Sequence, residues 1–208
     1  LEAKNGKDIQ LPLGKNVRVD TDGRTILADA NGQVLLINDK ICVEPIMELD
    51  GVNIKTGNIT FLGTVIVKGS VEDGFNVKAA GNIEVSGTVG KCTLESDGDI
   101  IVSSGIIGRD EGKIVCGGSL WAKFIQNTTV QVEENIVVTD SIMNSEVSAQ
   151  KKIILNGKRA QITGGKLFAT EIVMAKNIGS EGGGTETIIS VGVDPRAKKR
   201  LEKLLEMQ

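Results

Sequence analysis

The chain has 208 residues and a formal charge of −3, from 24 basic and 27 acidic side chains, which suits one large domain or two small ones. This nearly balanced charge excludes a protein that binds nucleic acid through bulk positive charge. No apolar run is long enough for a transmembrane helix and no signal-peptide pattern opens the chain, so we expect no membrane insertion. Histidine is absent, which removes the commonest general base and the commonest metal ligand.

Residues 1–51 predict an antiparallel β-meander built from short hairpins. Alternating apolar residues are typical of strands, and the dipeptides between these runs are typical of tight turns. We expect the meander to cap the repeat that follows, because an uncovered solenoid end is an open sheet edge. The alternating runs are 17–19, 26–28, 34–36 and 41–43, and the turn dipeptides are Asp22-Gly23, Asn31-Gly32 and Asn38-Asp39.

Residues 52–193 repeat a pattern of Gly, Asn and branched apolar residues, first visible as Gly-Asn-Ile at 57–59 and again at 81–83. Two series of apolar residues describe the repeat. Each member of the second lies six residues before a member of the first, although the step along the first varies from 14 to 24. The first series is Ile59, Ile83, Ile100, Leu120, Ile136, Ile153 and Leu167, and the second is Val77, Leu94, Ile114, Val130 and Val147.

A repeat of about 17 residues is too short for a strand–helix–strand unit and suits one coil of a β-solenoid. Each coil would stack on the next through parallel backbone hydrogen bonds, about 4.8 Å apart. Glycine and the Asn or Asp beside it would turn the corners, where Asn and Asp tolerate left-handed backbone. The predicted fold is all-β, a single-stranded parallel β-helix with an N-terminal hairpin module.

Residues 194–208 predict a short C-terminal helix. Asp194-Pro195 supplies an N-cap followed by a residue suited to the first helical position. The chain begins without Met and ends inside this helical pattern, so we expect it to be a fragment of a longer protein. The helix would cover the last coil or form a homodimer through an apolar stripe made by Leu201, Leu204 and Leu205.

Cysteine usage indicates a reducing compartment, and hence the cytoplasm. Cys42, Cys92 and Cys116 are an odd count with wide gaps, which fits neither a disulfide framework nor a zinc site. A catalytic cysteine needs a base, and the chain has no histidine, so we interpret all three as structural thiols. Two positions after the second series, Cys116 should point inward, whereas Trp121 lies between inward neighbours and should point outward.

The sequence predicts neither a metal site nor a cofactor. Glu95, Asp97 and Asp99 alternate and on a straight strand could share a face that holds a cation. Gly98 interrupts the strand there, however, and the other coils do not repeat the carboxylates. We therefore interpret these residues as solvated corners. The stretch 108–112, where one coil carries three extra residues, should bulge outward.

Two groups of side chains remain as candidates for contact with another molecule. Lys151, Lys152, Lys158 and Arg159, with Gly164-Gly165 close in sequence, could form an anion-binding or partner-binding corner, although a solvated basic edge is the plainer interpretation. Trp121 is the only tryptophan and is a poor sugar platform by itself. It is better interpreted as packing against a loop or a partner protein.

Several stretches, in order along the chain, resemble the flagellar assembly protein A family: "KDIQLPLGKNVRV", "ADANGQVL", "NVKAAGNIEVSGTV", "NGKRAQITGGKL" and "VGVDP" followed by a charged helix. The resemblance implies a right-handed β-helix in a cytoplasmic bacterial protein linked to flagellar assembly. It carries over no catalytic residue, because the family has none established.

The sequence therefore predicts a non-enzymatic β-solenoid scaffold that presents an interaction surface to partner proteins, in flagellar assembly or its regulation. The alternative is a β-helix that binds or acts on an acidic polymer through the basic edge near 151–166. A cleft with convergent basic and acidic side chains would favour the alternative, whereas flat faces with an apolar or mixed patch would favour the scaffold.

Overall fold

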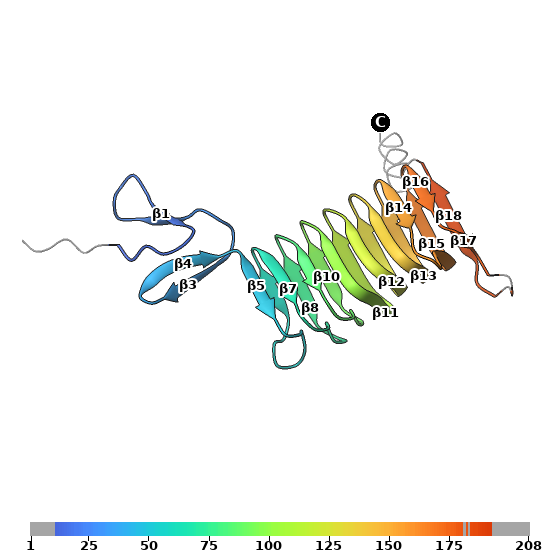
Figure 1. The fold of residues 1–208 in the computed structure, drawn as a ribbon, viewed down its shortest axis with the longest axis horizontal. Coiled ribbons are helices and arrows are strands. Elements are labelled where there is room, and N and C mark those ends of the chain that lie inside the picture. Colours follow the sequence, from blue (N-terminus) through green and yellow to red (C-terminus); the bar gives the residue numbers. More distant parts are fainter. Residues whose placement is uncertain (1–10, 181, 183, 193–208) are drawn as a thin grey trace, which may run out of the picture.

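The computed structural model describes residues 11–180, 182 and 184–192, which form an elongated all-β molecule (Figure 1). A parallel β-solenoid of about eight turns makes up most of its length. Two hairpins stand at the N-terminal end of the stack (Figure 1). The predicted C-terminal helix, with Leu201, Leu204 and Leu205, lies outside the described residues.

The N-terminal strands form hairpins, which confirms the predicted hairpin module, although the two hairpins are separate sheets and do not join into one meander. β1 (Val17–Val19) pairs antiparallel with β2 (Ile26–Ala28), and β3 (Gln33–Ile37) pairs antiparallel with β4 (Lys40–Glu44), but β2 does not pair with β3. Asn38 and Asp39 have φ values of 51° and 60°. These positive angles at both central residues are what the two-residue hairpin turn between β3 and β4 requires.

The solenoid begins earlier than the predicted residue 52. β5 (Ile46–Leu49) already pairs in parallel with β7 (Thr64–Val67), residue by residue. This pairing places the boundary between the hairpins and the solenoid before Ile46. Pro45 stands at that boundary, and its carbonyl accepts the Thr64 N–H at 2.9 Å, which ties the start of the first coil to the second.

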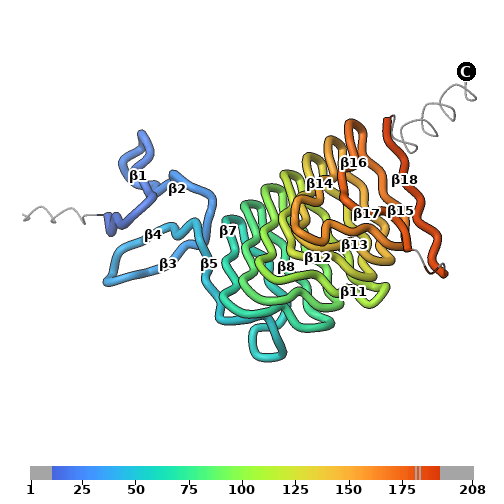
Figure 2. Tube along the Cα trace, turned by 45° about the vertical axis from the view of Figure 1, so that its right-hand side comes forward, coloured from blue at the N-terminus to red at the C-terminus, as the bar shows by residue number. Residues whose placement is uncertain are grey.

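Each coil contributes strands to three faces of the stack (Figure 2). Face A consists of β5, β7, β9 (Ile83–Val85), the first parts of β11 (Ile100–Cys116), β12 (Leu120–Val132) and β13 (Ile136–Ala149), then β14 (Lys152–Leu155) and β16 (Ile172–Met174). Face C consists of β6 (Ile59–Phe61), β8 (Asn76–Ala79), β10 (Thr93–Ser96), the last parts of β11 to β13, the end of β15 (Gln161–Ala169) and β18 (Thr187–Val191). Face B lies between them and includes β17 (Asn177–Ile178).

A principal column of buried apolar side chains stands behind each of the three faces, and faces A and C have a second inward position two residues later in each coil. The sequence predicts the principal columns of faces A and C but not that of face B, because face B carries one inward residue per coil without a Gly-Asn marker. The column behind face A includes Val65, Ile83, Ile100, Leu120, Ile136 and Ile153. The column behind face B is Val52, Val71, Val89, Ile106, Ile125, Ile142 and Ile162, all buried.

The column behind face C corrects the predicted series at both ends. Ile59 pairs with Val77, and Leu167 pairs with Val147, so both belong with the second series and not the first. The two Gly-Asn-Ile copies therefore lie at different corners of the coil. They look alike because both Asn residues make the same kind of hydrogen bond, in which the side-chain oxygen accepts a backbone N–H of the following coil.

The corner before face A is a ladder of such hydrogen bonds, which we call the corner ladder. The Asp99 N–H donates to Asn82 Oδ1 at 2.9 Å, and the Ser119 N–H donates to Asp99 Oδ1 at 2.8 Å. Thr64 Oγ1 and Ser119 Oγ accept the corresponding N–H groups of Asn82 and Asn135, each at 3.3 Å. None of these residues has a positive φ, so the predicted left-handed role is wrong and hydrogen bonding explains them instead.

The corner ladder also explains the glycines that precede it. A Cβ atom on Gly118 would lie 2.2 Å from Asp99 Oδ1, and one on Gly98 would lie 2.3 Å from Asn82 Oδ1. Both distances are far below van der Waals contact. These glycines therefore make room for the side chain of the preceding coil, and neither has a positive φ.

Candidate interaction surface

Face A carries an outward row of large apolar side chains, here called the apolar row: Ile101, Trp121, Val137, Ile154 and Met174. Neighbours in this row are direct partners in the parallel register. Ile101, Trp121 and Met174 are 36, 38 and 48% exposed, and the other two are half-buried. An unbroken outward apolar row over five neighbouring strands is unusual for a solvated sheet surface, where outward positions are normally polar.

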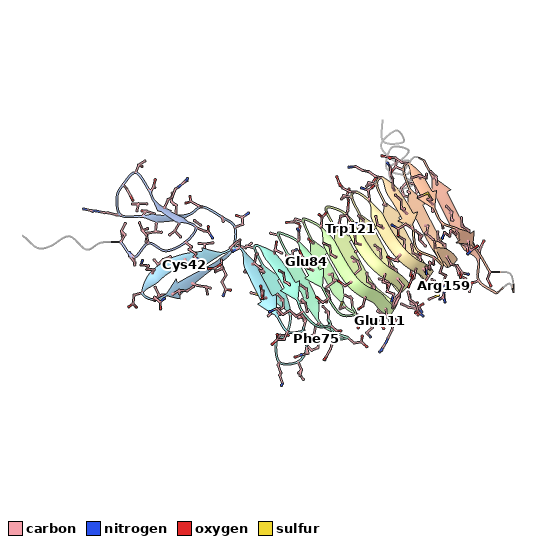
Figure 3. The ribbon with its side chains drawn as sticks, viewed as in Figure 1. Cys42, Phe75, Glu84, Glu111, Trp121 and Arg159 are labelled. Carbon is pink, nitrogen blue, oxygen red and sulfur yellow. The ribbon has the colours of Figure 1, made fainter. Side chains whose placement is uncertain are left out.

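Strand alternation produces this row. Leu120 and Ala122 are buried behind face A, so Trp121 between them must point away from the core. Figure 3 labels Trp121 on β12 and Glu84 on β9, two coils earlier in the same outward row. Cys116 is only 1% exposed, which confirms the prediction that Cys116 points inward and Trp121 outward.

Face C provides the contrast. Its corresponding outward row mixes charged, polar and apolar residues, as the sequence indicates, so no groove of one charge runs along it. One shallow depression on this face has a mainly apolar lining that includes Phe168 and Ile188, with polar side chains such as Gln131 and Lys166 around it, and no sequence pattern indicated it. The row reads Lys78, Glu95, Val115, Gln131, Ser148 and Phe168.

A shallow groove runs beside Ile101, Trp121 and Val137 of the apolar row, on the side where face A turns into face B. Ile101, Trp121 and Val137 line one side of it, and the opposite side is formed by Ser103, Lys123, Thr139 and Asn156. The sequence predicts an outward Trp121 but does not reveal its neighbours in the row. Strand register could have revealed them, because each lies one residue after a member of the inward column.

The structure does not bring the four predicted basic residues together. Lys151 precedes β14 and Lys152 is its first residue, whereas Lys158 and Arg159 follow β14, at the opposite edge of face A. Lys151 Nζ lies 2.7 Å from Glu134 Oε1 and Lys152 Nζ lies 3.4 Å from Glu171 Oε2. The first of these pairs raises the pKa of Lys151 and lowers the pKa of Glu134.

The glycines at 164–165 are also occupied within the fold. Both have positive φ values, 70° and 90°, and they turn the corner before face C. The Gly164 N–H donates to Thr187 Oγ1 at 2.8 Å, and the Gly165 N–H donates to the Glu186 carbonyl at 3.0 Å. Because these amides already have acceptors, this corner offers no backbone anion site.

The three cysteines are buried, as free thiols. Burial raises the pKa of Cys92 to about 12 and that of Cys116 to about 11, so both are protonated at neutral pH. Cys116 Sγ also donates to the backbone carbonyls of Gly98 and Ser119, at 3.2 and 3.3 Å. These features favour a packing role for both thiols over a nucleophilic one.

The carboxylates at 95–99 do not converge on one point. Glu95 pairs with Lys78 at 3.0 Å, and Asp99 accepts the Ser119 N–H in the corner ladder. Within the part of the chain that the structure describes, no three His, Cys, Asp or Glu side chains are grouped so that they could hold a metal ion. The same residues contain no helix long and apolar enough to cross a membrane.

Comparison with known proteins identifies one relationship. The profile of the Flagellar Assembly Protein A beta solenoid domain matches residues 45–208, which is most of the chain and includes the whole described solenoid. No curated protein and no solved structure shows significant similarity to the chain.

Proposed function

The chain belongs to the flagellar assembly protein A β-solenoid family, and we propose that it is a non-enzymatic scaffold whose face A binds partner proteins in flagellar assembly or its regulation. The proposal places this work in the cytoplasm, without a cofactor. A rigid stack suits such a role, because register fixes the spacing of side chains along each face at about 4.8 Å.

The observation that supports this proposal is the apolar row on face A. Exposed large apolar side chains are common singly, but a contiguous row marks a surface that another molecule covers. Tryptophan is enriched at the energetic centres of protein interfaces, and Trp121 occupies the second of the five positions of the row. The segment from residue 194, with Leu201, Leu204 and Leu205, is a second proposed contact, either as a cap on the last coil or as a homodimer element.

No observation favours the alternative, a site for an acidic polymer. Lys151 and Lys152 are paired with Glu134 and Glu171, and Lys166 lies 3.9 Å from Glu146. A polymer site would need basic groups that converge in a cleft, whereas Lys151, Lys152 and Lys166 are paired with carboxylates and Lys158 and Arg159 lie at the opposite edge of face A.

The experiment replaces Trp121 by Ser in the full-length protein and measures capture of partner proteins from its own cells. Phe168→Ser is the matched control, because Phe168 is an outward aromatic residue on face C. We expect the Trp121→Ser protein to capture no partner proteins and cells that carry it to lack the wild-type flagellar phenotype. The Phe168→Ser protein should behave like the wild type in both measurements. Equal behaviour of the two variants would contradict the assignment of face A.

A further inference from the structure

We propose that the partner element bound by face A is an acidic amphipathic helix, seated in the groove between the apolar row and Lys123. This inference rests on the proposed function and specifies the chemistry of its partner. It follows from three properties of this surface: the pairing of its strands, the length of the apolar row and the charge along the edge of the groove.

The strands of face A indicate a helix and not a strand as the occupant. From β7 to β14 every strand of this face is paired on both sides. The backbone groups of the face are therefore used, and a peptide lying along the groove finds none to pair with. An element that binds here must satisfy its own backbone hydrogen bonds, which a helix does.

The length of the apolar row matches a short helix. Five neighbouring strands at about 4.8 Å spacing give a row about 19 Å long. A helix rises about 1.5 Å per residue, so about 13 residues would cover the row. One helical turn advances about 5.4 Å, close to the coil spacing, so apolar side chains at i, i+4, i+7 and i+11 would each meet one coil.

The edge of the groove carries positive charge without carboxylate partners. Lys123, Lys158 and Arg159 are exposed, and none of them forms an ion pair with another described residue. Lys176 lies on the same edge, where its Nζ donates to the Lys158 carbonyl at 3.4 Å. In the coils from Ser103 to Arg159, Asp140 is the one carboxylate described on this edge, and it is half-buried; Asp50 stands on the same edge four coils before Lys123.

This asymmetry fixes the chemistry of the occupant. Carboxylates along one flank of the helix would face Lys123, Lys158 and Arg159, and charge-assisted contacts of this kind set orientation and association rate. On the other side of the apolar row, the corner ladder already uses its side-chain oxygens on backbone amides. The occupant therefore needs acidic residues on one flank only.

The chain offers its own reporter for this binding. Trp121 is the only Trp, and Tyr is absent, so tryptophan emission reports the groove alone. The probe is a displayed library of 16-residue helices with Leu at four positions spaced as above and with Glu, Lys or Gln in equal proportion at all flanking positions. The library is selected on the immobilised 208-residue chain, and the enriched peptides are synthesised and titrated against the chain in solution.

We expect Glu to be enriched along one flank and each enriched peptide to shift Trp121 emission to shorter wavelength. The triple variant Lys123→Glu, Lys158→Glu, Arg159→Glu should weaken binding at least about tenfold, and Trp121→Ser, followed with a labelled peptide, should do the same. Phe168→Ser and Lys113→Glu on face C are the matched controls and should bind like the wild type. Enrichment of Lys, no enrichment over bare support, or binding that survives both groove variants would overturn the proposal.

A second copy of the chain is the competing occupant, and sedimentation of the chain alone tests it. A dimer that Trp121→Ser dissociates would show that face A binds itself and would overturn the helix assignment. Failure of the peptide selection is distinguishable from failure of the proposed function. If only the helix assignment is wrong, Trp121→Ser still abolishes partner capture by the full-length protein. If the proposed function is wrong, Trp121→Ser leaves partner capture unchanged.

Discussion

The hairpin module and the solenoid are built from the same kinds of residue, yet they bury them very differently. Among the described residues before Ile46, only Cys42 and Val43 are buried, while Val34 and Leu36 are 66 and 70% exposed. In the solenoid, the inward residues of nearly every coil are buried completely. Isolated two-stranded hairpins are marginal in water, so the comparison shows that stacking, and not strand propensity, stabilises this chain.

Cys116→Asp should have the largest effect, because it tests the stacked core directly. A carboxylate at this 1% exposed position would have no cationic partner, and burying it should cost several kcal/mol of unfolding free energy. Leu36→Asp in the hairpin module and Trp121→Ser on face A should each change stability by about 1 kcal/mol or less. Thermal and urea melts check the ranking, and equal shifts for the three variants would contradict the column assignment.

Gly118→Ala should come next, since its Cβ would lie 2.2 Å from Asp99 Oδ1 in the corner ladder. Overpacking of this kind costs about 1–3 kcal/mol. Asp99→Ala should also destabilise, because it leaves the Ser119 N–H without its acceptor. The double variant should lose less than the sum, since removing the Asp99 side chain creates room for the new methyl group. Simple additivity in urea denaturation would rule out this explanation of the glycine.

The buried thiols predict a loss of stability at alkaline pH. The unfolded chain releases thiol protons above pH of about 8.5, whereas the folded chain holds those of Cys116 and Cys92 to pKa values of about 11 and 12. The unfolded state therefore binds fewer protons than the folded state as pH rises, so unfolding becomes more favourable from about pH 8.5 up to about pH 11, the folded pKa of Cys116. The variant Cys92→Ala, Cys116→Ala should show a flatter dependence in denaturant melts over this window. If the double variant showed the same pH dependence of unfolding free energy as the wild type, other titrating groups would be its cause.

The smallest effect should come from deleting Arg109, Asp110 and Glu111. The register runs from Ile107 to Gly112 opposite Gln126 to Thr128, so these are the three extra residues of the coil, as predicted. Arg109 pairs with Asp73, and Glu111 lies 3.0 Å from Lys91, but the pairs are largely exposed and contribute little. We expect the melting temperature to change by only a few degrees. A collapse of the solenoid would show that the bulge supports its neighbours.

The inward columns could be predicted because stacking forces one kind of side chain into the same place in every coil. Cys116 and Trp121 were assigned correctly for this reason: their offsets from the columns determine which way they point. Ile59 and Leu167 were misassigned because two different corners use the same hydrogen-bonding chemistry, and a Gly-Asn pair does not say which corner it turns.

The candidate surface was harder to predict, because it depends on register between coils and not on any motif. Ile101, Trp121 and Val137 lie 20 and 16 residues apart in sequence and become neighbours only through parallel pairing. The ion pairs that neutralise Lys151 and Lys152 likewise join residues of different coils, 17 and 19 positions apart. A basic sequence run alone could not reveal them.

The outward bulge at 108–111 shows that a corner of this solenoid can gain residues without changing the strand register of the faces. Three residues were accommodated at one corner, yet Ile106 still faces Ile125 and Ile114 still faces Val130 across the same interval. The spacing between coils therefore stays constant when residues are inserted at a corner. Evolution can vary the corners to suit new binding partners while the distance between any two contacts on face A stays fixed.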